Sequence, residues 1–331
     1  MLFKKLVLLI LIALSINLAV FSHVAFIFPV LVLLHLLFNE TDFFYRENSI
    51  YDETDLSRLF HKDAGPIEIV NYSDKAIIFV HGFPSCPNTF KYVAPLAEKA
   101  GYDVFVPLLP GFGTEKEDFI KSNFTQWFVY LCGYYLAKRR GYDKVYIVGV
   151  SLGGALTLKL AEKYSDTWLA PDGICVSGAP VFTNSIRQRI IKSWLLYSVR
   201  SLSWFIKFIA KPGEKWKEME DGHSEWLGYG GLFPVQSYSI KIAIEKIRAD
   251  LQKITVPIIA LHAPEDRTVN YKNMAYIEKK ISSEKKVFRT VDYKDRYNTH
   301  HILFLYESIR ENLMKEVLTF FKEIEVNAEL S

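Results

Sequence analysis

Short apolar segments alternate with amphipathic segments along most of this chain, and that alternation restricts the fold more than any other feature. Between residues 66 and 325, segments of strand character occur one at a time and are separated by segments of helical periodicity. We expect strands at residues 67–71, 76–80, 104–109, 145–148, 173–177, 256–262 and 286–291. We expect helices at residues 87–100, 123–140, 152–164, 271–281 and 303–323. This order predicts an α/β domain with a mostly parallel sheet that helices cover on both faces.

One insertion, at about residues 182–235, interrupts the alternation because it contains no convincing strand. It is rich in tryptophan and basic residues: Trp194, Trp204, Trp216 and Trp226, with Arg187, Arg189, Lys192, Arg200, Lys207 and Lys211. Because it lies between two expected core strands, we interpret it as a helical cap. We expect the cap over the carboxyl edge of the sheet, where open α/β sheets bind ligands.

The first 38 residues form a separate segment, which we expect to be a membrane anchor. After Lys4 and Lys5, the chain is almost entirely apolar as far as Phe38. As a helix this run would measure roughly 50 Å, against a hydrocarbon core of ~30 Å. We therefore expect one transmembrane segment from Leu6 to about Phe26, with a kinked or interfacial continuation from near Pro29.

An acidic linker, residues 39–65, follows the anchor, and a short tail, residues 326–331, ends the chain. With basic residues before a single span and acidic residues after it, the domain at residues 66–325 is expected on the non-cytoplasmic side. A hairpin at Pro29 would reverse that orientation.

Composition excludes several other classes of protein. The net charge of +3 is too small to indicate a nucleic-acid partner. The three cysteines, Cys86, Cys132 and Cys175, are widely spaced and favour neither a disulfide framework nor a zinc site. No cofactor motif is evident, so we expect no cofactor and no metal. The oligomeric state is not predicted by the sequence.

A serine stands where an expected strand meets an expected helix, in the sequence Gly149-Val-Ser-Leu-Gly153. This Gly-x-Ser-x-Gly pattern in a strand–turn–helix context is typical of a nucleophilic serine on a sharp, strained turn. Flanking glycines are needed because side chains there would collide with the neighbouring strand or with the returning helix. The alternative, a serine that merely caps a helix, explains the glycines less well.

A serine hydroxyl is inert at neutral pH without a base and a group that orients the base. In enzymes that use this turn, an acid and then a histidine follow the serine along the chain. Asp266 is our candidate acid because it leaves the strand at 256–262, and Glu265, Asp292 and Asp295 are alternatives. His301 is our candidate base because it abuts the expected closing helix, and His300 is the alternative.

Two backbone N–H groups would be needed to stabilise the oxyanion. We expect one from Leu152, directly after the serine. The other is expected from Phe83, in the loop that follows the strand at 76–80, where Gly82 would leave room for it.

Taken together, these motifs resemble the α/β-hydrolase family, in its bacterial carboxylesterase and monoacylglycerol-lipase-like branch. The resemblance covers roughly residues 66 to 325 and implies a Ser151–Asp266–His301 triad with an oxyanion hole at Phe83 and Leu152. This chain departs from the family pattern in two places. Position 300 is a histidine where the family usually has a small residue, often glycine, and the amino-terminal membrane segment is not part of the usual soluble enzyme.

We therefore expect a membrane-anchored serine hydrolase that cleaves carboxylic esters, such as acylglycerols or other fatty acyl esters. A serine aminopeptidase or amidase of the same fold is the enzyme alternative. The second alternative is a non-catalytic, membrane-bound binding protein that keeps the fold.

Overall fold

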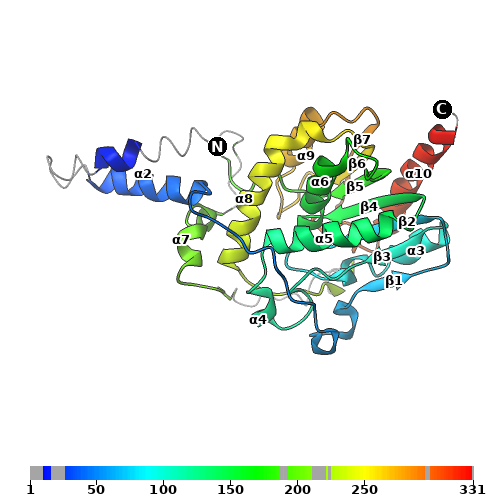
Figure 1. Cartoon of the computed structure of the whole chain (residues 1–331), viewed down its shortest axis with the longest axis horizontal. Helices are drawn as coiled ribbons and strands as arrows, with labels where there is room; N and C mark the ends of the chain where they lie inside the picture. The colour runs from blue at the N-terminus through cyan, green and yellow to red at the C-terminus, as the bar shows by residue number, and fades with distance from the viewer. Residues whose placement is uncertain are drawn as a thin grey trace.

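A twisted sheet forms the centre of the molecule (Figure 1). The computed structural model describes residues 10–15, 27–185, 189, 193–210, 221–222, 225–294 and 299–329. In this part of the chain the strands are β1 (Ile67–Ile69), β2 (Lys75–Val80), β3 (Asp103–Val106), β4 (Lys144–Val150), β5 (Gly173–Ser177), β6 (Ile258–His262) and β7 (Lys286–Thr290). They pair in the order β1-β3-β2-β4-β5-β6-β7, with β1 antiparallel and every other pair parallel. The predicted α/β fold with a mostly parallel sheet is confirmed.

Helices cover both faces of this sheet because its central strands are apolar on both sides. Ile78 and Val80 of β2 face a core completed by α5 (Phe124–Arg139), α6 (Leu152–Tyr164), α8 (Pro234–Asp250) and α9 (Lys272–Lys280). Their neighbours Ile77 and Phe79 face the opposite core, completed by α3 (Ala94–Lys99) and α10 (Arg310–Glu329). Successive strand side chains point to opposite faces, so an uninterrupted apolar strand has to be buried on both.

Three helical segments differ from the sequence-based expectation. The segment expected as one helix at residues 87–100 forms a 3₁₀ turn, Pro87–Phe90, and the shorter helix α3, Ala94–Lys99. The closing helix begins at Arg310 rather than at residue 303, because the apolar run from Leu303 to Tyr306 forms turns that are buried on every side. The hydrophobic periodicity of the sequence does not distinguish such a buried irregular run from a buried helix. Helix α8 was not expected, although Pro234 in its first turn and buried Ile240, Ile244 and Ile247 are helix signals.

The described part of the insertion carries a 3₁₀ turn, Trp194–Tyr197, and the short helix α7 (Val199–Ser203). Its carboxyl-terminal end packs on the loop after β2, where Ser85 and Gly228 form an isolated bridge and Tyr229 N–H donates to the carbonyl oxygen of Pro84 (3.1 Å). We keep the name cap for residues 182–235. Arg187, Lys192, Lys211 and Trp216 of the cap lie outside the described residues.

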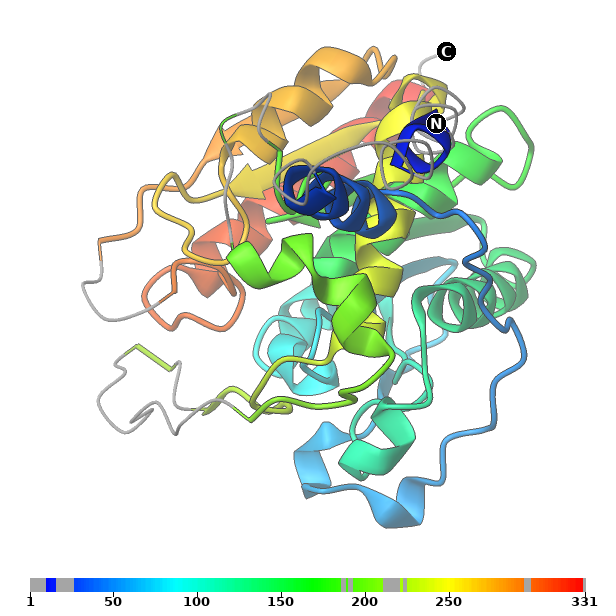
Figure 2. The same cartoon turned by 90° about the vertical axis from the view of Figure 1, so that its left-hand side faces the viewer.

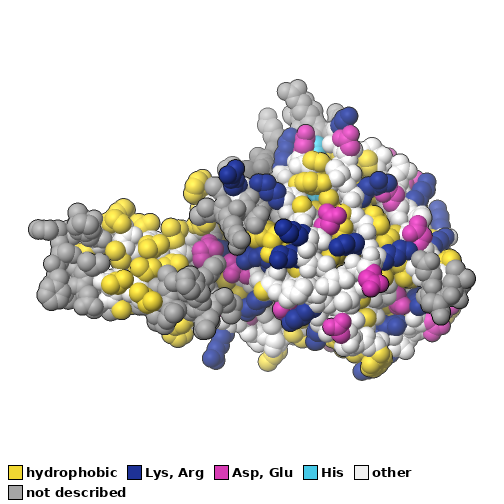
Figure 3. Space-filling model, turned by 90° about the horizontal axis from the view of Figure 1, so that it is seen from above, with side chains coloured by type: hydrophobic (Ala, Val, Ile, Leu, Met, Phe, Trp, Pro, Cys, Tyr) yellow, Lys and Arg dark blue, Asp and Glu magenta, His cyan; other side chains and the backbone are white. Residues whose placement is uncertain are grey.

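The amino-terminal helix α2 (Ile27–Glu40) projects from the body of the molecule beside α7 (Figures 1 and 2). Its exposed side chains include Phe28, Leu31, Val32, Leu33 and Leu36. Seen in space-filling form, hydrophobic side chains gather on this projecting arm (Figure 3). The arm therefore presents several large apolar side chains that are exposed among the described residues.

The end of α2 is fixed to the cap by buried polar contacts, which we call the clamp. The Arg200 guanidinium donates to the carbonyl oxygens of Phe38 (3.0 Å), Thr41 (3.1 Å) and Phe43. The Oδ1 atom of Asn39 accepts the backbone N–H of Arg200 at 2.9 Å. Because Arg200 and Asn39 are 4% and 0% exposed, breaking these bonds without replacement would leave buried polar groups unpaired.

Helix α8 contributes a second cation to the clamp. The Nζ atom of Lys241, a residue that is 2% exposed, donates to the carbonyl oxygens of Asn39 (3.0 Å) and Leu196 (2.9 Å) and to Glu40 Oε1 (2.6 Å). All three donor positions of the ammonium are therefore used. The cap, α8 and the end of α2 form one connected unit.

The predicted transmembrane segment, Leu6 to about Phe26, lies mostly outside the described residues. The chain that is described there, residues 10–15, is helical. Helix α2, which covers the expected continuation from Pro29, has 14 residues. Within the described part of the chain, no helix combines the length and the apolar character that crossing a bilayer requires.

The acidic linker is docked on the domain. Glu47 Oε2 accepts the N–H of Thr125 (3.0 Å) at the start of α5, and Asn123 Nδ2 donates to the Asn48 carbonyl (3.1 Å). A carboxylate at a helix amino-terminus satisfies free N–H groups and is favoured by the helix dipole. The linker thereby fixes the path from the clamp to β1.

Candidate active site

Ser151 occupies a strained turn between β4 and α6. Its φ of 56° and ψ of −118° lie outside the regions that non-glycine residues ordinarily adopt. The strain is held in place from both sides, because Ser151 N–H donates to the Ser177 carbonyl (2.8 Å) and α6 begins at the next residue. Its side chain makes no capping hydrogen bond to the helix, which argues against a purely structural serine.

The steric role expected of the flanking glycines is confirmed. A Cβ atom at Gly149 would lie 2.4 Å from the carbonyl oxygen of Gly153, and one at Gly153 would lie 1.9 Å from the carbonyl oxygen of Val80. A Cβ at Gly154 would lie 2.8 Å from Ala179 Cβ. These close approaches allow α6 to start directly against β2 and β5.

The structure brings Asp266 and His301 into direct contact. The distance from Asp266 Oδ2 to His301 Nδ1 is 2.7 Å, and the two side chains are 1% and 6% exposed. Burial alone would raise the pKa of Asp266. The charge of His301 and hydrogen bonds from His262 and His301 outweigh burial and hold that pKa well below its usual range.

Gly178 connects this pair to the serine. It follows Ser177, whose carbonyl accepts the Ser151 N–H, and its φ is +57°. A Cβ at Gly178 would lie 3.1 Å from His301 Nδ1 and 3.4 Å from Asp266 Oδ2, so the pair packs against this backbone. The Asp266–His301 pair therefore lies beside the residue that follows Ser177, whose carbonyl is bonded to the Ser151 N–H. Among the described residues, His301 Nε2 has no hydrogen-bond partner.

The alternative acids are placed differently. Glu265 is exposed, and the Asp292 side chain is 78% exposed and 3.5 Å from Lys294. Asp295 lies outside the described residues. Asp266, in contrast, is hydrogen-bonded to His301.

The neighbouring histidine, His300, has a different environment. It is 1% exposed, and its ring lies 5.0 Å from that of Tyr293. Its φ of 56° is a left-handed conformation that favours glycine, which explains why a small residue would suit this position. The expectation that His301 abuts the closing helix was wrong, because α10 starts only at Arg310. His301 is instead held by the turns that precede α10, where its backbone N–H donates to Tyr306 Oη (3.3 Å).

The loop after β2 passes directly over the serine. A Cβ at Gly82 would lie 3.1 Å from Ser151 Cβ and 3.2 Å from the Val150 carbonyl oxygen, so Gly82 makes room as expected. Phe83 follows in this loop, and Leu152 is the first residue of α6. Both backbone groups that we expected to bind an oxyanion therefore belong to segments that adjoin Ser151.

His81 anchors that loop, a role that the sequence did not reveal. It is completely buried, its Nδ1 lies 3.2 Å from the Gly82 carbonyl, and its Nε2 accepts the Leu109 N–H (3.2 Å). Burial lowers its pKa to about 4, so the ring is neutral at pH 7. A neutral ring can accept at Nε2 while Nδ1 donates. The available signal was a histidine directly after a buried strand.

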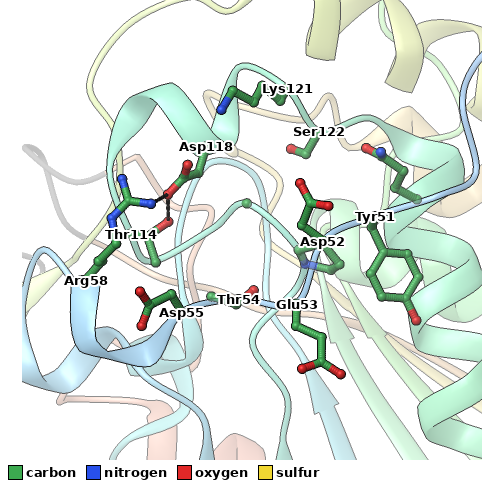
Figure 4. A pocket seen from close by; sticks show the side chains of 13 residues that line it. Tyr51, Asp52, Glu53, Thr54, Asp55, Arg58, Thr114, Asp118, Lys121 and Ser122 are labelled. Carbon is green, nitrogen blue, oxygen red and sulfur yellow. Dashed lines mark hydrogen bonds and ion pairs between the residues drawn. The ribbon is translucent and has the colours of Figure 1, made fainter.

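A polar depression lies elsewhere on the described part of the chain (Figure 4). Its volume is about 260 Å³, and it is lined by linker residues 51–55 and 58 and by residues between Pro110 and Gln126. The Arg58 guanidinium there is bound to Glu115 (2.5 Å) and Asp118 (3.3 Å). The depression contains no pairing of a nucleophile with a base, so we locate the candidate site at Ser151.

Comparison with known proteins agrees with this fold. The model of the alpha/beta hydrolase fold family matches residues 75–175, which include Phe83 and Ser151 and end before Asp266. A thermostable monoacylglycerol lipase of Bacillus sp. (strain H-257) is 35% identical over 108 residues, which are 32% of this chain and 40% of that protein. A carboxylesterase of Bacillus subtilis (strain 168) is 22% identical over 253 residues, 76% of this chain and 94% of that protein.

Solved structures show the same fold. A metagenome-derived lipolytic enzyme superposes with a TM-score of 0.66 at 20% identity, covering 79% of this chain and 98% of its own. A monoacylglycerol lipase of Paleococcus ferrophilus superposes with a TM-score of 0.63 at 13% identity, covering 78% and 98%. The chain therefore has the α/β-hydrolase fold, and parts of its sequence are similar to a lipase and a carboxylesterase.

Proposed function

We propose that this chain hydrolyses carboxylic esters through a Ser151–His301–Asp266 triad and an acyl-enzyme. The observation that carries the proposal is the 2.7 Å contact between Asp266 and His301 at the same sheet edge as the strained Ser151. The unsatisfied Nε2 of His301 is the atom that would accept the serine proton. Matches to a monoacylglycerol lipase and a carboxylesterase support the ester class.

In the proposed reaction, Ser151 Oγ attacks the ester carbonyl carbon while its proton passes to His301 Nε2. Asp266 holds the imidazole by its Nδ1–H and stabilises the imidazolium. The backbone N–H groups of Phe83 and Leu152 would bind the oxyanion of the tetrahedral intermediate. Collapse of the intermediate breaks the ester bond, and the proton on Nε2 goes to the leaving alkoxide. A water molecule, deprotonated by the same nitrogen, then cleaves the acyl-enzyme.

We propose fatty acyl esters, acylglycerols among them, as the substrate class. The Phe83 ring, beside the proposed oxyanion hole, lies 5.5 Å from that of Phe119 and 6.4 Å from those of Trp127 and Phe233. Those three rings are completely buried, so the partly exposed Phe83 ring is the aromatic surface next to the serine, and it favours an apolar acyl chain over the charged amino group of an aminopeptidase substrate.

A fluorophosphonate probe and a substrate panel test the proposal. We expect the probe to modify Ser151, located by peptide mass spectrometry. We also expect turnover of nitrophenyl esters of medium or long acyl chains and of monoacylglycerols, with much slower cleavage of aminoacyl naphthylamides. A folded protein that is not labelled would support a non-catalytic binding protein instead. Preferential naphthylamide cleavage would support an amidase.

We also propose that the amino-terminal segment attaches the enzyme to a membrane. Support comes from the apolar run that precedes Phe38 and from the exposed apolar face of α2. The exposed side chains of Trp194, Trp204 and Phe205 on the cap extend that apolar surface. The basic residues before this run and the acidic residues after it support a non-cytoplasmic catalytic domain, which protease accessibility in intact cells would test.

Fractionation of cells that express the full chain tests the attachment. We expect the protein in the membrane fraction after a wash with alkaline carbonate, and its release by detergent. Recovery of the full chain in the supernatant without detergent would contradict membrane attachment, and it would leave the proposed hydrolysis unaffected.

A further inference from the structure

A second histidine, His262, binds the carboxylate that contacts His301. His262 is the last residue of β6 and is 1% exposed. Its Nε2 atom lies 3.0 Å from Asp266 Oδ2 and 3.1 Å from the Val269 carbonyl oxygen. Asp266 Oδ2 is therefore shared between the imidazoles of His262 and His301.

The proton on this second histidine can be placed. An ionised carboxylate and a carbonyl oxygen are both acceptors, so the nitrogen that lies between them has to carry the hydrogen. His262 Nε2 therefore donates to Asp266 Oδ2 and to the Val269 carbonyl.

The carboxylate is saturated with donors. Oδ1 accepts the backbone N–H groups of Thr268 (2.7 Å) and Val269 (2.8 Å). Oδ2 accepts His301 Nδ1 (2.7 Å) and His262 Nε2 (3.0 Å). With two lone-pair sites on each oxygen in use, the orientation of the carboxylate is fixed, and part of its negative charge is directed away from His301.

We propose that His262 is a positioning residue for the triad, which acts through Asp266 and not on the substrate. Its N–H holds Asp266 Oδ2 in line with His301 and weakens the pull of the carboxylate on the imidazolium. His301 then releases its proton more readily to the leaving group. This inference rests on the proposed function and extends it by one residue.

Among the described residues, the titratable and charged groups nearest the two histidines come from three segments. They are Asp266 with exposed Glu265 and Arg267 on the loop after β6, Tyr271 before α9 (5.5 Å between its ring and that of His262), and His300 and Tyr306 on the segment before α10. Of these groups, Asp266 is the one to which both histidines are bonded.

Two substitutions of similar size at His262 distinguish a positioning role of this residue from a role in packing alone. In His262→Leu the donor is lost, so Oδ2 attracts the proton of His301 more strongly. We expect the acidic limb of the kcat/KM profile to move to higher pH by about half a unit or more. We also expect kcat to fall by about 10-fold as Asp266 loses its alignment.

In His262→Gln the side-chain amide can still donate to Asp266 Oδ2. We therefore expect this variant to keep most of the wild-type kcat, with the acidic limb of its kcat/KM profile at the same pH as in the wild type. If the two variants lose activity equally with an unshifted profile, or if His262→Leu matches the wild type, the inference is wrong.

A measurement on the wild-type protein covers the case in which His262→Leu does not fold. Nitrogen-15 NMR, with the signal assigned through His262→Gln, is expected to show a protonated Nε2 at every pH at which the enzyme is active. An unprotonated Nε2 would overturn the inference.

The outcomes also separate this inference from the proposed function. Turnover that survives Ser151→Ala would end the proposed function itself. An inactive Ser151→Ala variant beside a normal pH profile in His262→Leu would end this inference alone.

Discussion

Replacing Ser151 with alanine is expected to lower kcat/KM for acyl esters by roughly 10⁴- to 10⁶-fold, because the nucleophile is removed and only binding and the oxyanion donors remain. The fold should be retained, since the Ser151 side chain makes no capping bond and alanine fits the same backbone. Ester hydrolysis and thermal unfolding, measured on the same preparation, check both parts of this prediction.

Ser165→Ala is a matched control for that variant. It removes a hydroxyl at the other end of α6, where the contact to Thr255 N–H is a weak 3.3 Å, and activity should stay at the wild-type level. Comparable turnover by the Ser151→Ala and wild-type proteins would refute the role of the serine.

Replacing Gly153 with alanine is expected to destabilise the whole domain by about 3 kcal/mol or more, the range of severe core defects. The added Cβ would lie 1.9 Å from the carbonyl oxygen of Val80 and 2.7 Å from that of His81. Both atoms are main chain at the end of β2, so relief requires moving a central strand or the start of α6. Either movement also displaces the loop that carries Phe83, and activity should fall with stability.

Gly133→Ala is the control for Gly153→Ala. It lies within α5, where an added Cβ meets no atom within 4 Å, and alanine there should stabilise the protein by about 0.5–1 kcal/mol. Urea unfolding of both variants gives the comparison. A Gly153→Ala protein that unfolds at the wild-type urea concentration would mean that α6 does not start as tightly against β2 as described.

The parts of this structure that the sequence predicted are those with local causes. Apolar strands such as β2 and β4 are buried on both faces, and the glycines around Ser151 are required by contacts within a few residues of the turn. Asp266 was predicted as the acid, in preference to Glu265, from its place in the loop. The Asp266 side chain is buried and Glu265 is exposed, which agrees with that prediction.

The features that were missed depend on contacts between distant segments. Nothing local indicates that Arg200 binds carbonyl groups near residue 40, or that His262 turns towards Asp266. The start of α10 was misplaced because a buried irregular turn and a buried helix have the same apolar composition. In contrast, α8 had readable signals in Pro234 and its spaced isoleucines.

The clamp has a mechanical consequence for the cap. Arg200 and Lys241 bind main-chain carbonyl groups at the end of α2, so these contacts do not depend on the identity of the side chains there. Lys241 also binds the Leu196 carbonyl, next to α7. Any displacement of α7 must therefore carry the end of the amino-terminal arm with it, and whatever restrains the arm also restrains this part of the cap.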